Sequence, residues 1–145
     1  MQDELSLLDL HIALFDIIYI ISCIDGSTDK SENKRLQDYR AKDWLLFKPF
    51  FEDKTLIVQD AELEAESSRL NDMTQQNLVK RFHSAIYSIV KRKEFIKEYE
   101  GFGRTLLDYI YGMIQSDQRI RVSEKRLFDM LKENLNVADK NNSVK

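Results

Sequence analysis

The sequence contains few of the residues that make tight turns, with one proline and four glycines in 145 residues. An all-β fold needs many such turns, and they depend on glycine and proline at fixed positions. No segment of the sequence shows a sustained alternation of apolar and polar residues either. These absences argue against a sandwich or barrel. Apolar residues recur at spacings of three and four, which predicts amphipathic helices.

Cysteine, basic charge and long apolar runs are also scarce. Cys23 is the single cysteine, and its place in an apolar run predicts a buried free thiol in a reducing compartment. The net charge of −3 lacks the basic excess of nucleic-acid-binding domains. The longest apolar stretch, 12–24, is interrupted by Asp16 and falls short of the roughly 18–20 residues of a membrane span. Residues 1–9 are acidic, unlike a signal peptide. We expect a cytoplasmic protein with no integral membrane segment and no nucleic-acid partner.

What the sequence does contain fits one helical domain. With 43% hydrophobic and 32% charged residues, it has the composition of a globular protein and the length to bury a core. We predict an all-α fold, a single-domain bundle of about 6–7 helices over residues 1–137. The polar segment 138–145 lacks apolar anchors and is expected to be a disordered tail.

The expected helices follow from apolar spacing and from caps. They cover about 5–24, 29–48, 55 or 60 to 70, 72–93, 94–116 and 122–134. Asn71-Asp72 is the expected cap of the fourth helix, with Gln75 in the reciprocal position. Gly101-Phe102-Gly103 is a weak point in the fifth. Phe47, Phe50 and Phe51 surround Pro49 and are expected to pack in the core.

The segment 80–93 is basic and offers a candidate interaction surface. Its cationic residues are Lys80, Arg81, Lys91, Arg92 and Lys93. Three alternatives are open for them: pairing with the acidic segment 52–66, binding an anionic partner, or solvation.

The sequence repeats itself with an offset of 92 residues. FDIIYIISCIDGSTDKSE (15–32) aligns with LDYIYGMIQSDQRIRVSE (107–124), and six of the seventeen positions from 16 to 32 are identical. Chance predicts roughly one identity in that length. Both copies have the order apolar helix, aspartate, short loop, Ser-Glu, next helix. The chain therefore contains two related helix–turn–helix units.

Each unit carries two acids, Asp25 and Glu32 in the first and Asp117 and Glu124 in the second. An aspartate at the end of a helix opposes the helix dipole, so its presence twice suggests a compensating role. The four carboxylates could cap their own loops, or converge and bind a divalent cation such as Ca²⁺, Mg²⁺ or Mn²⁺. A calcium-binding EF-hand is excluded, because Leu36 cannot supply its last carboxylate and Lys30 replaces its glycine.

These two turns resemble the TerB-like family of small all-helical proteins, named for bacterial tellurite resistance. Its pattern, an apolar helix, D-G-x-[I/V]-x-x-x-E and a second helix, occurs twice per domain. Here Thr28 and Gln118 depart from it. The resemblance implies a stress-response role, complexes with partner proteins near the membrane, and an acidic surface that binds a divalent metal. Zn²⁺ joins Ca²⁺, Mg²⁺ and Mn²⁺ as a candidate for that metal. A metal-free protein-interaction domain, in which the acids only cap helices, is the alternative.

Enzymatic chemistry has little support. His11 and His83 are the only histidines, and neither follows a glutamate three positions earlier as in di-metal helical bundles. No Ser–His–Asp order, nucleophile elbow or glycine-rich phosphate loop is present. We therefore expect a protein that is not an enzyme. Both histidines are expected on apolar helical faces, as residues of the core or its boundary.

Overall fold

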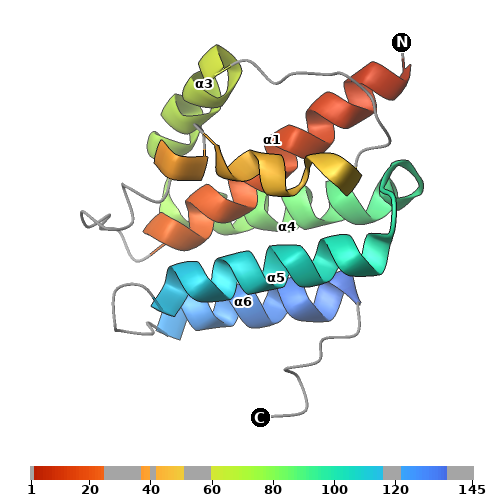
Figure 1. Cartoon of the computed structure of the whole chain (residues 1–145). Helices are drawn as coiled ribbons and strands as arrows, with labels where there is room; N and C mark the ends of the chain where they lie inside the picture. Colours follow the sequence, from red (N-terminus) through yellow and green to blue (C-terminus); the bar gives the residue numbers. More distant parts are fainter. Residues whose placement is uncertain (1, 25–36, 40–41, 51–59, 116–121, 137–145) are drawn as a thin grey trace.

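The computed structural model describes residues 2–24, 37–39, 42–50, 60–115 and 122–136 (Figure 1). All regular structure within these residues is helical, which confirms the predicted all-α fold. The α-helices are α1 (Gln2–Cys23), α3 (Asp60–Asn71), α4 (Gln75–Lys91), α5 (Tyr99–Gln115) and α6 (Val122–Leu135). Short 3-10 helices are η1 (Asp43–Leu46), η2 (Lys48–Phe50) and η3 (Lys93–Phe95). The predicted tail 138–145 lies outside the described residues.

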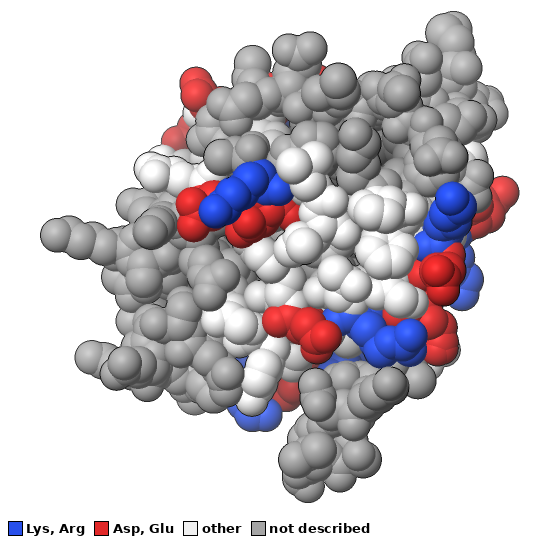
Figure 2. Space-filling view, viewed as in Figure 1, with Lys and Arg blue, Asp and Glu red and all other residues white. Residues whose placement is uncertain are grey.

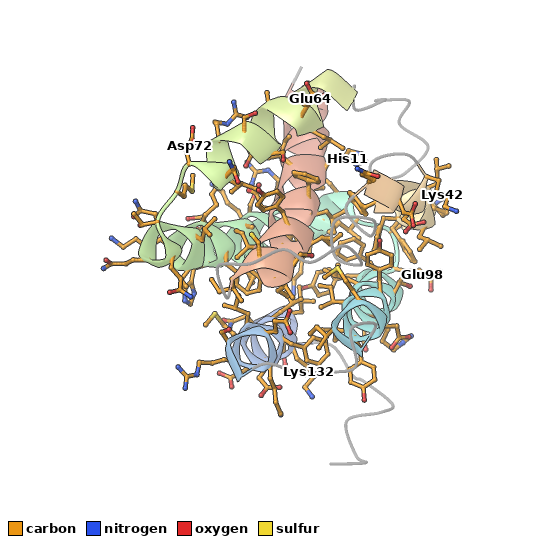
Figure 3. The ribbon with its side chains drawn as sticks, turned by 90° about the vertical axis from the view of Figure 1, so that its left-hand side faces the viewer. His11, Lys42, Glu64, Asp72, Glu98 and Lys132 are labelled. Carbon is orange, nitrogen blue, oxygen red and sulfur yellow. The ribbon has the colours of Figure 1, made fainter. Side chains whose placement is uncertain are left out.

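Helix α1 occupies the centre of the fold. It packs against α3, α4, α5, α6 and η3, and its most extensive contact is with α4. Its side chains from Leu10 to Ile24 are buried except for Ile12 and Cys23, which are partly buried. A helix with apolar residues on every side is stable only when other elements surround it. Helices α5 and α6 lie side by side on one side of α1, and α3 lies on the opposite side (Figures 1 and 3).

Helices α4, α5 and α6 are amphipathic, and each turns its apolar face to the core. The buried residues of α4 include the four predicted from spacing, Leu78, Phe82, Ile86 and Ile89. Helices α5 and α6 bury Leu106, Ile110, Met113, Ile114, Leu127 and Leu131. No helix in the described part of the chain combines the length and the apolar composition that crossing a membrane requires.

An aromatic layer connects η1 and η2 to α5. Phe47 is fully buried, and its ring centroid lies 5.9 Å from that of Phe102 and 6.2 Å from that of Tyr109. Phe50 lies 5.9 Å from Phe102 in the same way, and its carbonyl accepts a 2.7 Å hydrogen bond from Lys97 N. The prediction that the rings around Pro49 pack in the core is thus confirmed for Phe47, whereas Phe50 is partly buried and packs against the core, and Phe51 lies outside the described residues.

Three predicted helix boundaries are wrong. The N-cap of α4 is Thr74, whose hydroxyl accepts a 3.2 Å hydrogen bond from Asn77 N, and not Asn71-Asp72. The fifth helix begins at Tyr99 and not at Glu94, because Glu98 has a left-handed backbone with φ 49°. Residues 43–50 form the 3-10 helices η1 and η2 instead of continuing an α-helix.

The predicted weak point in the fifth helix is continuous helix. Gly101 and Gly103 both lie within α5. A Cβ atom added to Gly101 would lie 3.4 Å from the Phe50 ring, which is an ordinary van der Waals contact between α5 and η2. The glycines therefore do not interrupt the helix.

Candidate functional site

Of the four acids predicted to bind a cation, the structure describes one. Glu124 lies in the first turn of α6 and is 1% exposed. Asp25, Glu32 and Asp117 lie outside the described residues, so whether the four carboxylates converge stays a prediction. Within the described residues, no three His, Cys, Asp or Glu side chains come together as a metal site would need.

The two helices that begin the repeated units have different surroundings. Ile18 of α1 and its counterpart Ile110 of α5 are both fully buried. Asp16, however, is buried, whereas its counterpart Asp108 is exposed. Identical residues therefore occur in α1, which other helices surround, and in α5, which is amphipathic.

The predicted basic surface is divided between exposed and paired residues. Lys80, Lys91 and Lys93 are exposed. Arg92 binds Asp9 of α1 at 2.9 Å, and Arg81 binds Glu66 of the acidic segment at 2.8 Å. Pairing with the acidic segment, one of the three alternatives, is thus found for Arg81. Use of the exposed lysines by a partner stays a prediction.

A cluster of four charged side chains, of which the two carboxyl groups are buried, joins α1, α3 and α4. We call it the carboxyl cluster, and it consists of Asp16, Glu66, Arg69 and Arg81. Arg69 donates two hydrogen bonds to Oε1 of Glu66, at 2.7 and 3.0 Å, and Arg81 donates one to Oε2 at 2.8 Å. Glu66 is 0% exposed, so its burial is compensated by two guanidinium groups.

Asp16 is less well compensated than Glu66. Nε of Arg81 lies 3.1 Å from its Oδ2, close enough for an ion pair but not aligned as a hydrogen bond. Its Oδ1 is buried, and no N–H or O–H group of the described residues donates to it. Among the described residues, Arg81 is the one cation that pairs with this acid, whereas Glu66 pairs with two arginines.

The electrostatics of the two acids differ accordingly. The pKa of Asp16 is raised to about 9, and burial is the largest cause. A hydrogen bond with Glu66 and the negative charge of Glu66 also raise this pKa, whereas Arg81 lowers it. Burial also acts to raise the pKa of Glu66, but hydrogen bonds from Asp16, Arg81 and Arg69 outweigh it and hold that pKa well below its usual range. Two adjacent buried carboxyls cannot both ionise freely, and the balance of these effects favours the charged form of Glu66 over that of Asp16.

Sequence reasoning did not predict the carboxyl cluster, although three of its members left a signal. Asp16 interrupts the apolar stretch 12–24. Glu66 stands between Leu63 and Leu70 at the spacing of one buried helical face, where an apolar residue is expected. Buried acids on two helices require a cation nearby, which a third helix can supply. Arg81 is a candidate for this cation because it stands next to Phe82, a buried residue of α4.

The histidines divide between core and surface. His11 is buried, as predicted, and its burial lowers its pKa from 6.5 to about 4. His83 is exposed, which contradicts its predicted place on an apolar face. The prediction failed because position 83 lies next to the buried Phe82 and on the outer side of α4.

No protein-family model, curated protein or solved structure matches the chain. The resemblance to the TerB-like family therefore depends on the residues of the two turns.

Proposed function

We propose that the chain is a non-enzymatic TerB-like module of stress response, and that its two Asp–x6–Glu turns bind one divalent cation. Glu124 carries the proposal. An acid that only caps a helix can do so while solvated, whereas Glu124 is 1% exposed. It therefore faces the interior, as convergence of the two turns requires. Its counterpart Glu32, with Asp25 and Asp117, would supply the further oxygen ligands that such a cation needs.

Metal titration tests this proposal. After treatment with a chelator, the protein is expected to bind one equivalent of Ca²⁺, Mg²⁺, Mn²⁺ or Zn²⁺, measured by native mass spectrometry. Binding should raise the melting temperature, because a ligand at 100 times its Kd stabilises the folded state by about 2.7 kcal/mol.

The variant Glu124→Gln should lose both the bound mass and the thermal shift. Glu133→Gln is the matched control, because Glu133 lies in the same helix and is exposed. If none of the four metals binds, or if Glu124→Gln binds as well as the control, the cation part of the proposal fails.

A second candidate function is a metal-free protein-interaction domain, in which the acids serve as caps. Exposed apolar side chains favour it: Leu45 and Leu46 of η1 are about half exposed, and Tyr87 of α4 is 66% exposed. In Figure 2 the described charged residues lie in mixed groups around an uncharged area over the η1–η2 segment. Such a surface suits a protein partner, including one in a membrane-associated complex.

Chelation separates the two functions. A partner retained equally with and without chelator favours the interaction domain, and a partner lost on chelation favours the cation-binding module. Leu45→Ser with Leu46→Ser should release the partner in the first case only, whereas Glu124→Gln should release it in the second only.

A further inference from the structure

The attachment of α3 depends on a charged residue in the middle of its buried face. The fully buried side chains described in α3 are Leu63, Glu66 and Leu70, which follow one another at spacings of three and four. Its main contact is with α1, on the side away from α5 and α6. Glu64 of α3 and Asp72, the residue directly after α3, lie at the outer edge of the molecule (Figure 3). The inner face of α3 therefore places a carboxylate where another apolar residue would be expected.

That carboxylate meets a second one. Glu66 and Asp16 are 0% and 3% exposed, and they interact directly between α3 and α1. Of the cations in the described part of the chain, Arg81 binds both acids and Arg69 binds Glu66. Two ionised carboxylates in this position would repel each other without water to screen them. A single proton between them replaces that repulsion by a hydrogen bond. It also accounts for the buried Oδ1 of Asp16, to which no N–H or O–H group of the described residues donates.

We propose that Asp16 and Glu66 share one proton, and that this proton makes the carboxyl cluster a pH-responsive latch that holds α3 on α1 and α4. Loss of the proton leaves two buried negative charges facing each other, and release of α3 separates them. This latch is independent of cation binding by the two turns.

The direction of the pH response follows from linkage. With α3 in place the pKa of Asp16 is raised to about 9, whereas an exposed aspartate has its ordinary value of 3.8. Between these values the closed state binds one proton more than the open state. Opening of α3 therefore releases a proton, and its equilibrium constant rises by up to about tenfold per pH unit. The stabilising effect is complete below about pH 4 and is lost as the pH rises through 9.

No other described charge is among the groups that set this response. The groups acting on Asp16 are Glu66 of α3 and Arg81 of α4. Those acting on Glu66 are Asp16, Arg81 and Arg69. None of these belongs to the described parts of α5, α6 or η3, although all three pack against α1. Arginine stays protonated through the range, so Asp16 is the group that titrates.

Hydrogen exchange of the full chain tests the latch. After correction for the intrinsic exchange rate, the amides of α3 should open up to about 100-fold more often at about pH 8 than at about pH 6. Asp16→Asn should abolish this dependence, because the amide is uncharged and donates to Glu66 at every pH. Asp108→Asn is the matched control at the equivalent position of the repeat, where the aspartate is exposed, and it should keep the dependence.

Equal protection of α3 at the two pH values in the wild type would overturn the proposal, as would an unchanged dependence in Asp16→Asn. Should Asp16→Asn fail to fold, carbon-detected NMR of the wild-type carboxyl groups decides the matter. An Asp16 carboxyl that titrates above about pH 7 supports the latch, and one that titrates at its ordinary value excludes it.

Discussion

His11 is a histidine that the fold keeps neutral. It is 6% exposed, and burial lowers its pKa from 6.5 to about 4. In the unfolded chain it accepts a proton below about pH 6.5, whereas in the folded protein it does so only near pH 4. Its contribution to stability is therefore complete above pH 6.5 and is lost as the pH falls towards 4.

Replacement of His11 by glutamine should remove this acid sensitivity. Between about pH 6.5 and 4.5 the wild type should lose about 1.4 kcal/mol per pH unit relative to His11→Gln, measured by urea unfolding. The comparison is made between variants because the Asp16 proton acts with the opposite sign over the same range. His83→Gln, at an exposed position, should track the wild type. Parallel curves for the wild type and His11→Gln would refute the prediction.

At the scale of elements, the start of α4 shows which contacts determine the first residue of a helix. Thr74 has an extended backbone, and its hydroxyl binds Asn77 N, whereas the side chain of Gln75 donates to the carbonyl of Ile24. The reciprocal bond of the predicted capping box is thus replaced by a tertiary one that fastens the end of α1 to the start of α4. Several residues before α4 have side-chain oxygens that could cap the helix. The tertiary contact of Gln75 favours a helix that starts at this residue, with Thr74 as its cap.

Paired alanine substitutions test that assignment. Thr74→Ala should lower the free energy of unfolding by about 1 kcal/mol, since it removes the acceptor of an otherwise unpaired helix N–H. Asp72→Ala should change it by less than about 0.5 kcal/mol, because Asp72 is exposed and lies outside α4. Thermal or urea unfolding of the two variants gives the comparison. A larger loss from Asp72→Ala would restore the cap predicted from the sequence.

The helices themselves could be predicted from the sequence, because apolar spacing marks the buried face of each. Leu78, Phe82, Ile86 and Ile89 are an example in which every predicted core residue is buried. The left-handed backbone at Glu98 could not be predicted in this way, because no local preference favours it in a glutamate. The carboxyl cluster was missed for another reason. Periodicity shows that Asp16 and Glu66 belong to buried faces, but not that those faces meet.

For the molecule as a whole, the central placement of α1 means that the helices should unfold together in one cooperative transition. Ile17 is 0% exposed in a helix that touches every other α-helix described. We expect Ile17→Ala to lower the free energy of unfolding by about 2–5 kcal/mol, from lost burial and from the cavity that remains. Unfolding followed by circular dichroism and by intrinsic fluorescence should shift together.

Tyr87→Ala provides the surface comparison. Tyr87 is 66% exposed on α4, and its removal should change stability by about 0.5 kcal/mol or less. If Ile17→Ala shifts one probe and not the other, the helices unfold separately and the collective interpretation is wrong.

The central position of α1 also has a consequence for synthesis of the chain. Translation proceeds from the N-terminus, so α1 leaves the ribosome before α3, α4, α5 and α6, which together cover it. Its principal partner, α4, begins at Gln75, more than fifty residues after α1 ends at Cys23. During that interval a helix apolar on all sides has no native surface to bury against, and such segments aggregate or bind chaperones. The residues that contribute most to the finished core are thus the ones exposed longest while the protein is made.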